Sequence, residues 1–401
     1  MTNNKFDYRY IPVKKGSIYH MYPWYLWRID LWVLFFKPHK NKIDKIYKNL
    51  KEYFLTKDIF FLDSGKSAIV ISLKALNVKK NDEVCVSVFV CPDVIDTIIT
   101  MEAKPVFIDC EENLLIDPID LQRKINHKTK CIITTNIYGS SEKDEIYKIA
   151  KENRVKVIDD LAQSFEIIKR GNISIYSVGP KKIINTTGGG IIVTEEIDIS
   201  EKINLIIPKE SVSYTELVKM FIECIRYYSF FFLLKIQNIF KIKIISISKE
   251  KRPTDYLKPK YINPKKMNVR TIYSLYLKIK YYYIYKKSLE QKIDYLDNSL
   301  KKFDWIKIPQ KNINNLNSYY TIRVEKGIRY KLGLYLAEHG FQTTWNYVPA
   351  TWYDAYQDNK DKTPNAFSLS EKVLSLPFRG LSNKRIKKMI SIISNFEKEL
   401  L

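Results

Sequence analysis

The sequence predicts an α/β fold built on a mainly parallel β-sheet, followed by a smaller α+β domain. Between about residues 60 and 194, short apolar runs rich in β-branched residues alternate with segments of helical period. Apolar strands separated by amphipathic helices are typical of a parallel sheet that helices cover on both faces. The chain has 401 residues, 45% of them hydrophobic, which is enough for two packed domains.

Six runs are predicted to be strands of the large sheet: 83–90, 104–110, 130–138, 155–160, 173–178 and 190–196. Helix-period segments lie between several of them, at 68–76, 92–101 and 142–152. Ligands of such sheets bind at the carboxyl ends of the strands. The residues that directly follow the predicted strands are therefore the first candidates for a functional site.

The alternation stops after residue 205, where an aromatic run and then a basic, proline-containing stretch follow. We expect an insert there that ends in a mobile loop. A long helix is expected from Asn268 to about Leu300, and strand and helix alternate again after it. The predicted division is 1–205 for the N-terminal segment and large domain, 206–265 for the insert, and 266–401 for the long helix and small domain.

The spacing of the cysteines and histidines indicates neither a set of disulfides nor a metal site. The five cysteines are odd in number and irregularly spaced, without a CxxC pair, and the four histidines lie far apart. We therefore expect no disulfide framework and no metal site, and a reducing cytoplasm suits such a chain. The polar N-terminus also lacks the apolar core of a signal peptide.

The formal net charge of +23 has two explanations, which composition leaves open. One is an anionic partner such as a nucleotide diphosphate or an acidic membrane surface. The other is compositional drift in a chain rich in Lys, Ile, Asn and Tyr, since the lysines are scattered. No nucleic-acid-binding motif accompanies the charge, so we expect no nucleic-acid partner.

Two aromatic-rich stretches, at 21–36 and 227–234, are too short and too interrupted by charge to span a bilayer. Arg28 and Asp30 interrupt the first, and Arg226 and Lys235 bound the second. Each stretch is either core or oligomer interface, or a segment that lies on a membrane surface with lysines toward the headgroups.

Gly65-Lys66-Ser67 ends like a P-loop, but Phe60 stands where that motif needs its first glycine. The nucleotide-hydrolase interpretation therefore fails. A helix that starts near Ser67 can still bind phosphate through its free N–H groups. The alternative is an ordinary helix cap.

Two further candidates follow predicted strands. Asp159 and Asp160 come directly after an apolar strand, where they are either active-site carboxylates or a helix cap that favours the helix dipole. Lys182 lies in a turn between Gly179 and the glycine run 188–190. Such a lysine either projects into a pocket or belongs to a solvent-facing basic hairpin.

Together the motifs occur in a characteristic order: Ser64-Gly65-x-x-Ala68, Asp160-x-x-Gln163, and Ser177-x-x-x-x-Lys182 ahead of three glycines. In this order they resemble the DegT/DnrJ/EryC1/StrS family of pyridoxal-phosphate-dependent sugar aminotransferases. The resemblance covers about residues 60–195 and extends to segments 318–324, 340–345 and 373–382. It implies fold type I: a mostly parallel seven-stranded sheet between helices in a large domain, and a smaller C-terminal α+β domain.

The resemblance also implies roles for individual residues. Lys182 would bind the cofactor covalently, Asp160 would pair with its pyridine nitrogen, and Gln163 would contact its ring hydroxyl. Phosphate would be bound by Ser177 and by the backbone around Gly65 and Lys66. Asn268, in an Asn-x-Arg segment, would reach the phosphate of a neighbouring subunit in a homodimer.

The chain also departs from the family pattern. The aromatic residue that stacks on the cofactor should fall near Cys91, with Phe89 two residues away on the same strand. The segment between Gln163 and Ser177 is short, the glycine run lacks an acidic member, and the 206–265 insert is atypical.

The expected function is transfer of an amino group, from glutamate, to a nucleotide-linked keto-sugar for surface glycan biosynthesis. Lysine supplies the amine for a Schiff base, and a buried carboxylate keeps the pyridine nitrogen protonated. Retention of Lys182 argues against the relatives that carry histidine there and perform dehydration. Another pyridoxal-phosphate reaction on this scaffold and a non-catalytic protein at a membrane surface are the alternatives.

Overall fold

The computed structural model describes residues 26–165, 167, 169–240, 261–309, 319–344, 347, 349–352 and 362–400. Its centre is a seven-stranded sheet in the order β1-β7-β6-β5-β4-β2-β3. The strands are β1 (Asp58–Leu62), β2 (Glu83–Ser87), β3 (Lys104–Ile108), β4 (Thr129–Thr135), β5 (Lys156–Asp160), β6 (Ile173–Ser177) and β7 (Gly190–Thr194). β7 is antiparallel to both β1 and β6, and the other pairs are parallel. The mostly parallel seven-stranded sheet is thus confirmed.

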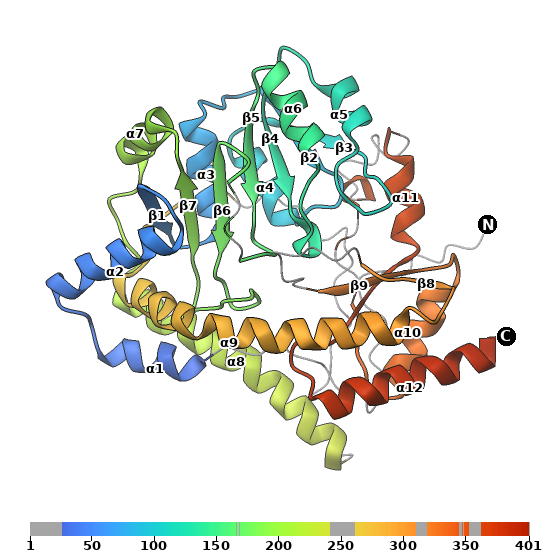
Figure 1. Cartoon of the computed structure of the whole chain (residues 1–401). Coiled ribbons are helices and arrows are strands. Elements are labelled where there is room, and N and C mark those ends of the chain that lie inside the picture. The colour runs from blue at the N-terminus through green and yellow to red at the C-terminus, as the bar shows by residue number, and fades with distance from the viewer. Residues whose placement is uncertain are drawn as a thin grey trace.

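Helices cover both faces of this sheet (Figure 1). In the large domain they are α2 (Lys40–Tyr53), α3 (Gly65–Ala75), α4 (Pro92–Thr100), α5 (Pro118–Lys124), α6 (Asp144–Glu152) and α7 (Ile197–Ile206), with a short 3-10 turn η1 (Ile137–Gly139). Side chains alternate between the two faces along each strand. Phe60 and Ile192 pack into the core below α3, whereas Phe61 and Ile191 belong to the core on the opposite face. The strands carry apolar side chains on both faces of the sheet, because helices bury both faces.

A smaller three-stranded sheet, in the order β10-β9-β8, lies in the C-terminal part. Its elements are β8 (Ile306–Lys307), β9 (Tyr320–Val324), α10 (Ile328–Glu338), η3 (Ala350–Trp352), α11 (Pro364–Ser370), β10 (Val373–Leu376) and α12 (Asn383–Leu400). The long helix α9 (Val269–Leu300) runs beneath the large sheet toward this small one (Figure 1). It begins where predicted, because the side chain of Asn268 accepts a hydrogen bond from the Arg270 N–H.

The predicted division does not describe two helices. α1 (Trp27–Phe35) packs on α9, and α8 (Tyr214–Phe240) contacts α1 and runs obliquely away from α9 (Figure 1). The first half of the predicted insert is therefore helical. The loop expected in its second half falls on residues 241–260, outside the described residues, as do residues 21–25 of the first aromatic stretch. The side chains of the second stretch lie outside the description too, except that of Ser229. The boundaries 1–205, 206–265 and 266–401 remain a proposal.

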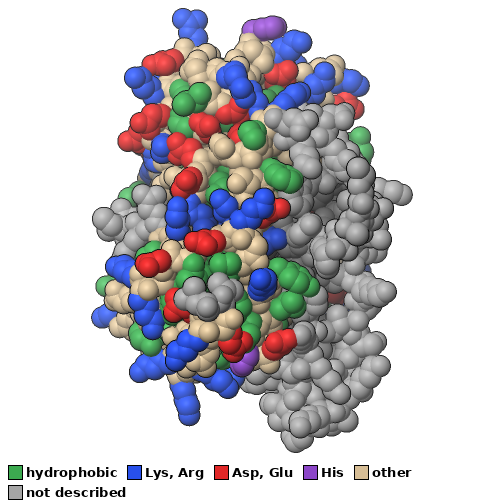
Figure 2. Space-filling view, turned by 90° about the vertical axis from the view of Figure 1, so that its right-hand side faces the viewer, with side chains coloured by type: hydrophobic (Ala, Val, Ile, Leu, Met, Phe, Trp, Pro, Cys, Tyr) green, Lys and Arg blue, Asp and Glu red, His purple; other side chains and the backbone are tan. Residues whose placement is uncertain are grey.

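The charged side chains do not gather on one side of the face that Figure 2 shows. Lysine and arginine side chains there are interspersed with aspartate and glutamate. No helix in the described ranges has the length and apolar content needed to cross a membrane. The described part of this face therefore shows no single basic groove.

Glu142, in the loop before α6, is a buried carboxyl whose Oε2 accepts a hydrogen bond of 3.1 Å from the Ile116 N–H. Burial raises its pKa to about 8. The folded state therefore binds the proton more tightly than the unfolded chain, where the pKa is about 4.3. The contribution of the Glu142 proton to the free energy of unfolding is complete below about pH 4.3. It is lost as the pH rises toward 8.

Glu142→Gln is expected to remove this pH dependence, because an amide still accepts from Ile116 without being ionised. The melting temperature of the Glu142→Gln variant should exceed that of the natural chain by about 2 to 5 °C near pH 8 and by much less near pH 5. Thermal unfolding followed by circular dichroism tests this, with exposed Glu201→Gln on α7 as the control. Equal shifts at both pH values would contradict the ionisation argument.

Candidate active site

A cavity of about 670 Å³ lies at the carboxyl ends of β5 and β6. Asp160 is the last residue of β5, Ser177 is the last of β6, and Lys182 follows in the turn after β6. Six of the nine residues predicted from the sequence line this cavity: Gly65, Lys66, Cys91, Asp160, Ser177 and Lys182. Neighbouring parallel strands bring these residues together, because the carboxyl ends of the strands meet at one edge of the sheet.

Asp160 is buried at the wall of the cavity, and its Oδ1 accepts a 2.9 Å hydrogen bond from the Ala162 N–H. Burial raises the pKa of this carboxyl, while the positive charge of Lys182 and the Ala162 N–H oppose that rise. A cationic group bound in the cavity would lower the pKa further and keep Asp160 ionised. The site therefore favours a ligand that presents a positive N–H group to Asp160.

The backbone of Lys182 is held from three directions. Its N–H donates to the Gly179 carbonyl at 3.0 Å. Its carbonyl accepts from Asn185 Nδ2 at 3.3 Å and from Arg379 Nη2 at 3.0 Å. Arg379 belongs to the segment after β10, so the small domain helps to hold the turn that carries Lys182.

The start of α3 lines the cavity next to Ser177. Ser64 caps this helix by accepting the Ser67 N–H at 3.1 Å, and Gly65 and Lys66 occupy its first turn. A Cβ on Gly65 would lie 3.2 Å from the Ser177 side chain. The glycine thus allows the helix to begin directly beside Ser177, and a helix start with a neighbouring hydroxyl is a suitable anion site.

The other three predicted residues do not line this cavity. Gln163 lies close to it, and its Oε1 accepts the Tyr138 N–H at 2.7 Å. Phe89 is fully buried in the apolar core, so it is Cys91 that lines the cavity wall. Asn268 donates to the Val212 carbonyl at 2.7 Å and lines a second cavity of about 490 Å³.

The sequence analysis missed a second wall of the main cavity. Lys219, Met220, Glu223 and Cys224 of α8 line it together with the turn of Lys182. The spacing i, i+1, i+4, i+5 places them on one side of a helix. No pattern in the sequence could have shown that this side faces the cavity, because α8 reaches it only through tertiary packing.

Tyr347 is a second residue that the motifs did not single out. Its hydroxyl lies 3.5 Å from Gln163 Nε2, and burial raises its pKa, with nearby Cys91 adding to the shift. It follows the predicted small-domain segment 340–345, of which residue 345 lies outside the described residues. The segment is therefore close to the cavity.

The model of the DegT/DnrJ/EryC1/StrS aminotransferase family matches residues 37–215. This matched segment, 179 of the 401 residues, is thus similar to that family. The matched segment contains every predicted cavity residue from Gly65 to Lys182. It ends at the start of α8, so all four residues of the second wall lie outside the family match.

Among the relatives, the GDP-perosamine synthase of Vibrio cholerae is 28% identical over 169 residues, 40% of this chain and 46% of that protein. The chain thus spans about half the length of the curated relatives that it matches. Among solved structures, a Brucella abortus aminotransferase of the family aligns with a TM-score of 0.69 at 18% identity, over 92% of this chain and 95% of its own. NtdA from Bacillus subtilis, solved with bound cofactor PMP, aligns with a TM-score of 0.70 at 18% identity, over 95% and 87%. These alignments confirm the fold over 92 to 95% of the chain.

Pyridoxal phosphate, the cofactor expected from the family resemblance, fits the residues that the cavity presents. Asp160 offers a buried carboxylate for a protonated ring nitrogen, and Lys182 offers an amine. The start of α3 and Ser177 offer donors for phosphate. A volume of about 670 Å³ is ample for the cofactor and part of a substrate.

Proposed function

We propose that this chain is a pyridoxal-phosphate-dependent aminotransferase that transfers an amino group to a nucleotide-linked keto-sugar. The proposal depends above all on one observation: Lys182 and Asp160 line the same cavity as the start of α3. Glutamate is the proposed donor, and the proposed product serves surface glycan biosynthesis. The relative named GDP-perosamine synthase supports a sugar nucleotide as the substrate.

Each residue has a defined task in the proposed reaction. Pyridoxal phosphate, when bound, supplies the electron sink. Asp160 keeps a proton on the ring nitrogen, because a buried carboxylate stabilises the cation beside it. The start of α3 and Ser177 hold the phosphate. The amine of Lys182 binds the cofactor and, once released, moves a proton as a general base and acid.

The wall formed by α8 is proposed to contact the sugar nucleotide. Lys219 is exposed at the cavity and offers a cation for a diphosphate, while Glu223 lies one turn away and offers an acceptor for hydroxyls. We also propose a cytoplasmic homodimer in which Asn268 and Arg270, at the second cavity, face the partner subunit.

Borohydride reduction of the cofactor-loaded protein is expected to abolish a visible absorption band and to leave the cofactor mass on Lys182. The attachment follows from the cavity, where the Lys182 charge acts on Asp160. Peptide mass spectrometry locates the adduct, and Lys181→Ala is the control because Lys181 also lines the cavity. An adduct on Lys181, or a band that persists in Lys182→Ala, would overturn the assignment.

A further inference from the structure

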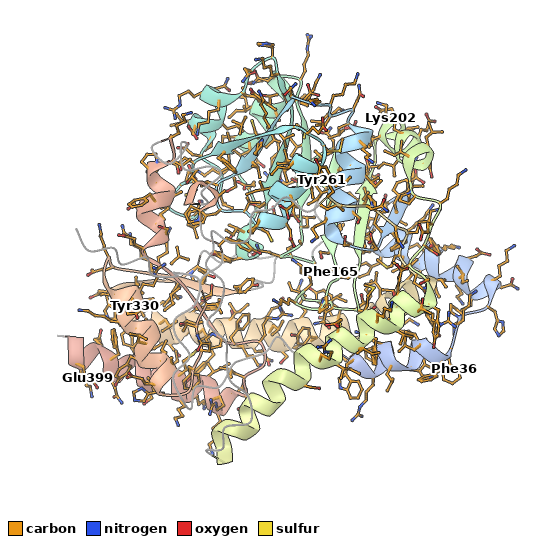
Figure 3. All side chains as sticks on the ribbon, turned by 180° about the vertical axis from the view of Figure 1, so that it is seen from behind. Phe36, Phe165, Lys202, Tyr261, Tyr330 and Glu399 are labelled. Atoms are coloured by element: carbon orange, nitrogen blue, oxygen red, sulfur yellow. The ribbon has the colours of Figure 1, made fainter. Side chains whose placement is uncertain are left out.

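Two helices that lie about 190 residues apart in sequence, α1 and the first part of α8, come together in the fold. Leu34 of α1 packs in one cluster with Leu217 and Phe221 of α8. α1 and the first part of α8 lie next to each other near one end of α9 in both Figure 1 and Figure 3, and Figure 3 labels Phe36 directly after α1. The segments therefore contribute to one surface.

This surface, the α1/α8 face, exposes large apolar side chains. Its members are Leu26, Trp27, Leu31, Trp32, Phe35 and Phe36 of α1 and its flanks, and Ile222 and Ile225 of α8. Phe35 is 71% exposed and Phe36 is 54% exposed. The opposite side of α1 is buried, with Asp30, Val33 and Leu34 turned toward the protein. α1 is thus apolar toward solvent as well as toward the core, which indicates a binding surface.

Positive charge predominates in the segment that contains α1 and the start of α2. Between residues 26 and 48, six exposed basic side chains stand against one exposed carboxylate, Asp44. The basic residues are Arg28, Lys37, Lys40, Lys42, Lys45 and Lys48. Asp30 does not offset them at the surface, since it is buried in an ion pair with Lys278. Exposed tryptophan and phenylalanine beside lysines are typical of helices at a membrane interface.

We infer that the α1/α8 face docks onto an anionic lipid surface. The basic side chains complement the headgroups, and the aromatic side chains enter the interface. A second copy of the chain suits this face less well, because a twofold interface would bring the same positive segment against itself. The cavity would stay open, since Lys219 and Glu223 lie on the side of α8 that faces it, whereas Ile222 and Ile225 point elsewhere on the helix.

Co-sedimentation of the full chain with vesicles tests this inference. Binding is expected to vesicles of equal parts phosphatidylcholine and phosphatidylglycerol at about 50 mM salt, but not to phosphatidylcholine alone or at about 500 mM salt. Trp27→Ser with Phe35→Ser is expected to weaken binding at least about tenfold. The matched apolar control is Ile197→Ser with Leu205→Ser, two exposed residues of α7.

A second pair of variants separates charge from apolar insertion. Lys40→Gln with Lys45→Gln should weaken binding about tenfold, whereas Lys148→Gln with Lys151→Gln on α6 lowers the net charge equally and should have little effect. Failure of the natural chain to bind anionic vesicles at low salt would overturn the inference. So would sedimentation velocity that shows Trp27→Ser with Phe35→Ser converting a dimer to monomers, because the face would then join two copies.

Discussion

Replacing Asp160 by alanine is expected to reduce transamination at least about 10²-fold while leaving the chain folded, since removal of one pre-placed electrostatic partner has effects of this size. The carboxyl lies in the cavity and has one backbone donor, the Ala162 N–H. The loss should appear in kcat more than in KM, because the charge acts on the reacting ring rather than on the sugar. Steady-state kinetics of the cofactor-loaded variant measure it.

Asp159 provides the matched control, since it precedes Asp160 in β5 but points away from the cavity. Its carboxylate accepts hydrogen bonds from Thr134 Oγ1 at 2.7 Å, Tyr147 Oη at 2.8 Å and the Gly171 N–H at 2.7 Å. Asp159→Asn would turn an amide toward these donors and should lower stability rather than kcat per folded molecule. Near-natural turnover in Asp160→Ala would contradict the proposed role of that residue.

Replacing Lys278 by methionine is expected to lower the free energy of unfolding by about 3 to 5 kcal/mol, the usual cost of leaving one member of a buried ion pair alone. Lys278 of α9 pairs with Asp30 of α1, and neither side chain has more than 1% exposure. Asp30 also accepts from Ser274 Oγ at 2.5 Å. Lys278 donates to the Asn185 carbonyl at 2.5 Å, three residues beyond Lys182.

The double variant Asp30→Leu with Lys278→Met is the informative control, because it removes both charges and should recover most of the lost stability. Lys287→Met changes an exposed lysine on the same helix and should cost little. Urea unfolding gives the free energies. A loss in Lys278→Met that the double variant does not recover would show that packing, rather than an unpaired charge, causes the effect.

The large domain was predictable because its signals are local. Apolar runs bounded by turns predicted β2 to β7 within a few residues, and Asn268 predicted the start of α9. The ordered motifs also predicted most of the cavity. Asp160 and Ser177 end strands, Gly65 and Lys182 follow strands within a few residues, and parallel strands bring such positions to one edge.

Other predictions needed information that no local pattern contains. Phe89 and Cys91 lie two residues apart, and only packing shows that Phe89 belongs to the core whereas Cys91 lines the cavity. Asn268 lines a different cavity within one chain, so its proposed contact with Lys182's cofactor requires a partner subunit. The roles of the nine predicted residues stay predictions until the variants are measured.

The sequence alone determined the fold class, the resemblance to the aminotransferase family and the core of the candidate site, because strand period, turn residues and motif order are properties of neighbouring residues. Tertiary structure decided three further features. It placed α8 as the second wall of the cavity, joined Asp30 to Lys278 across 248 positions, and combined α1 with α8 in one apolar face. The physical reason is the same in each case: contacts between distant segments depend on how helices pack on the sheet, and the period of one helix shows that it has an apolar side without showing what that side meets.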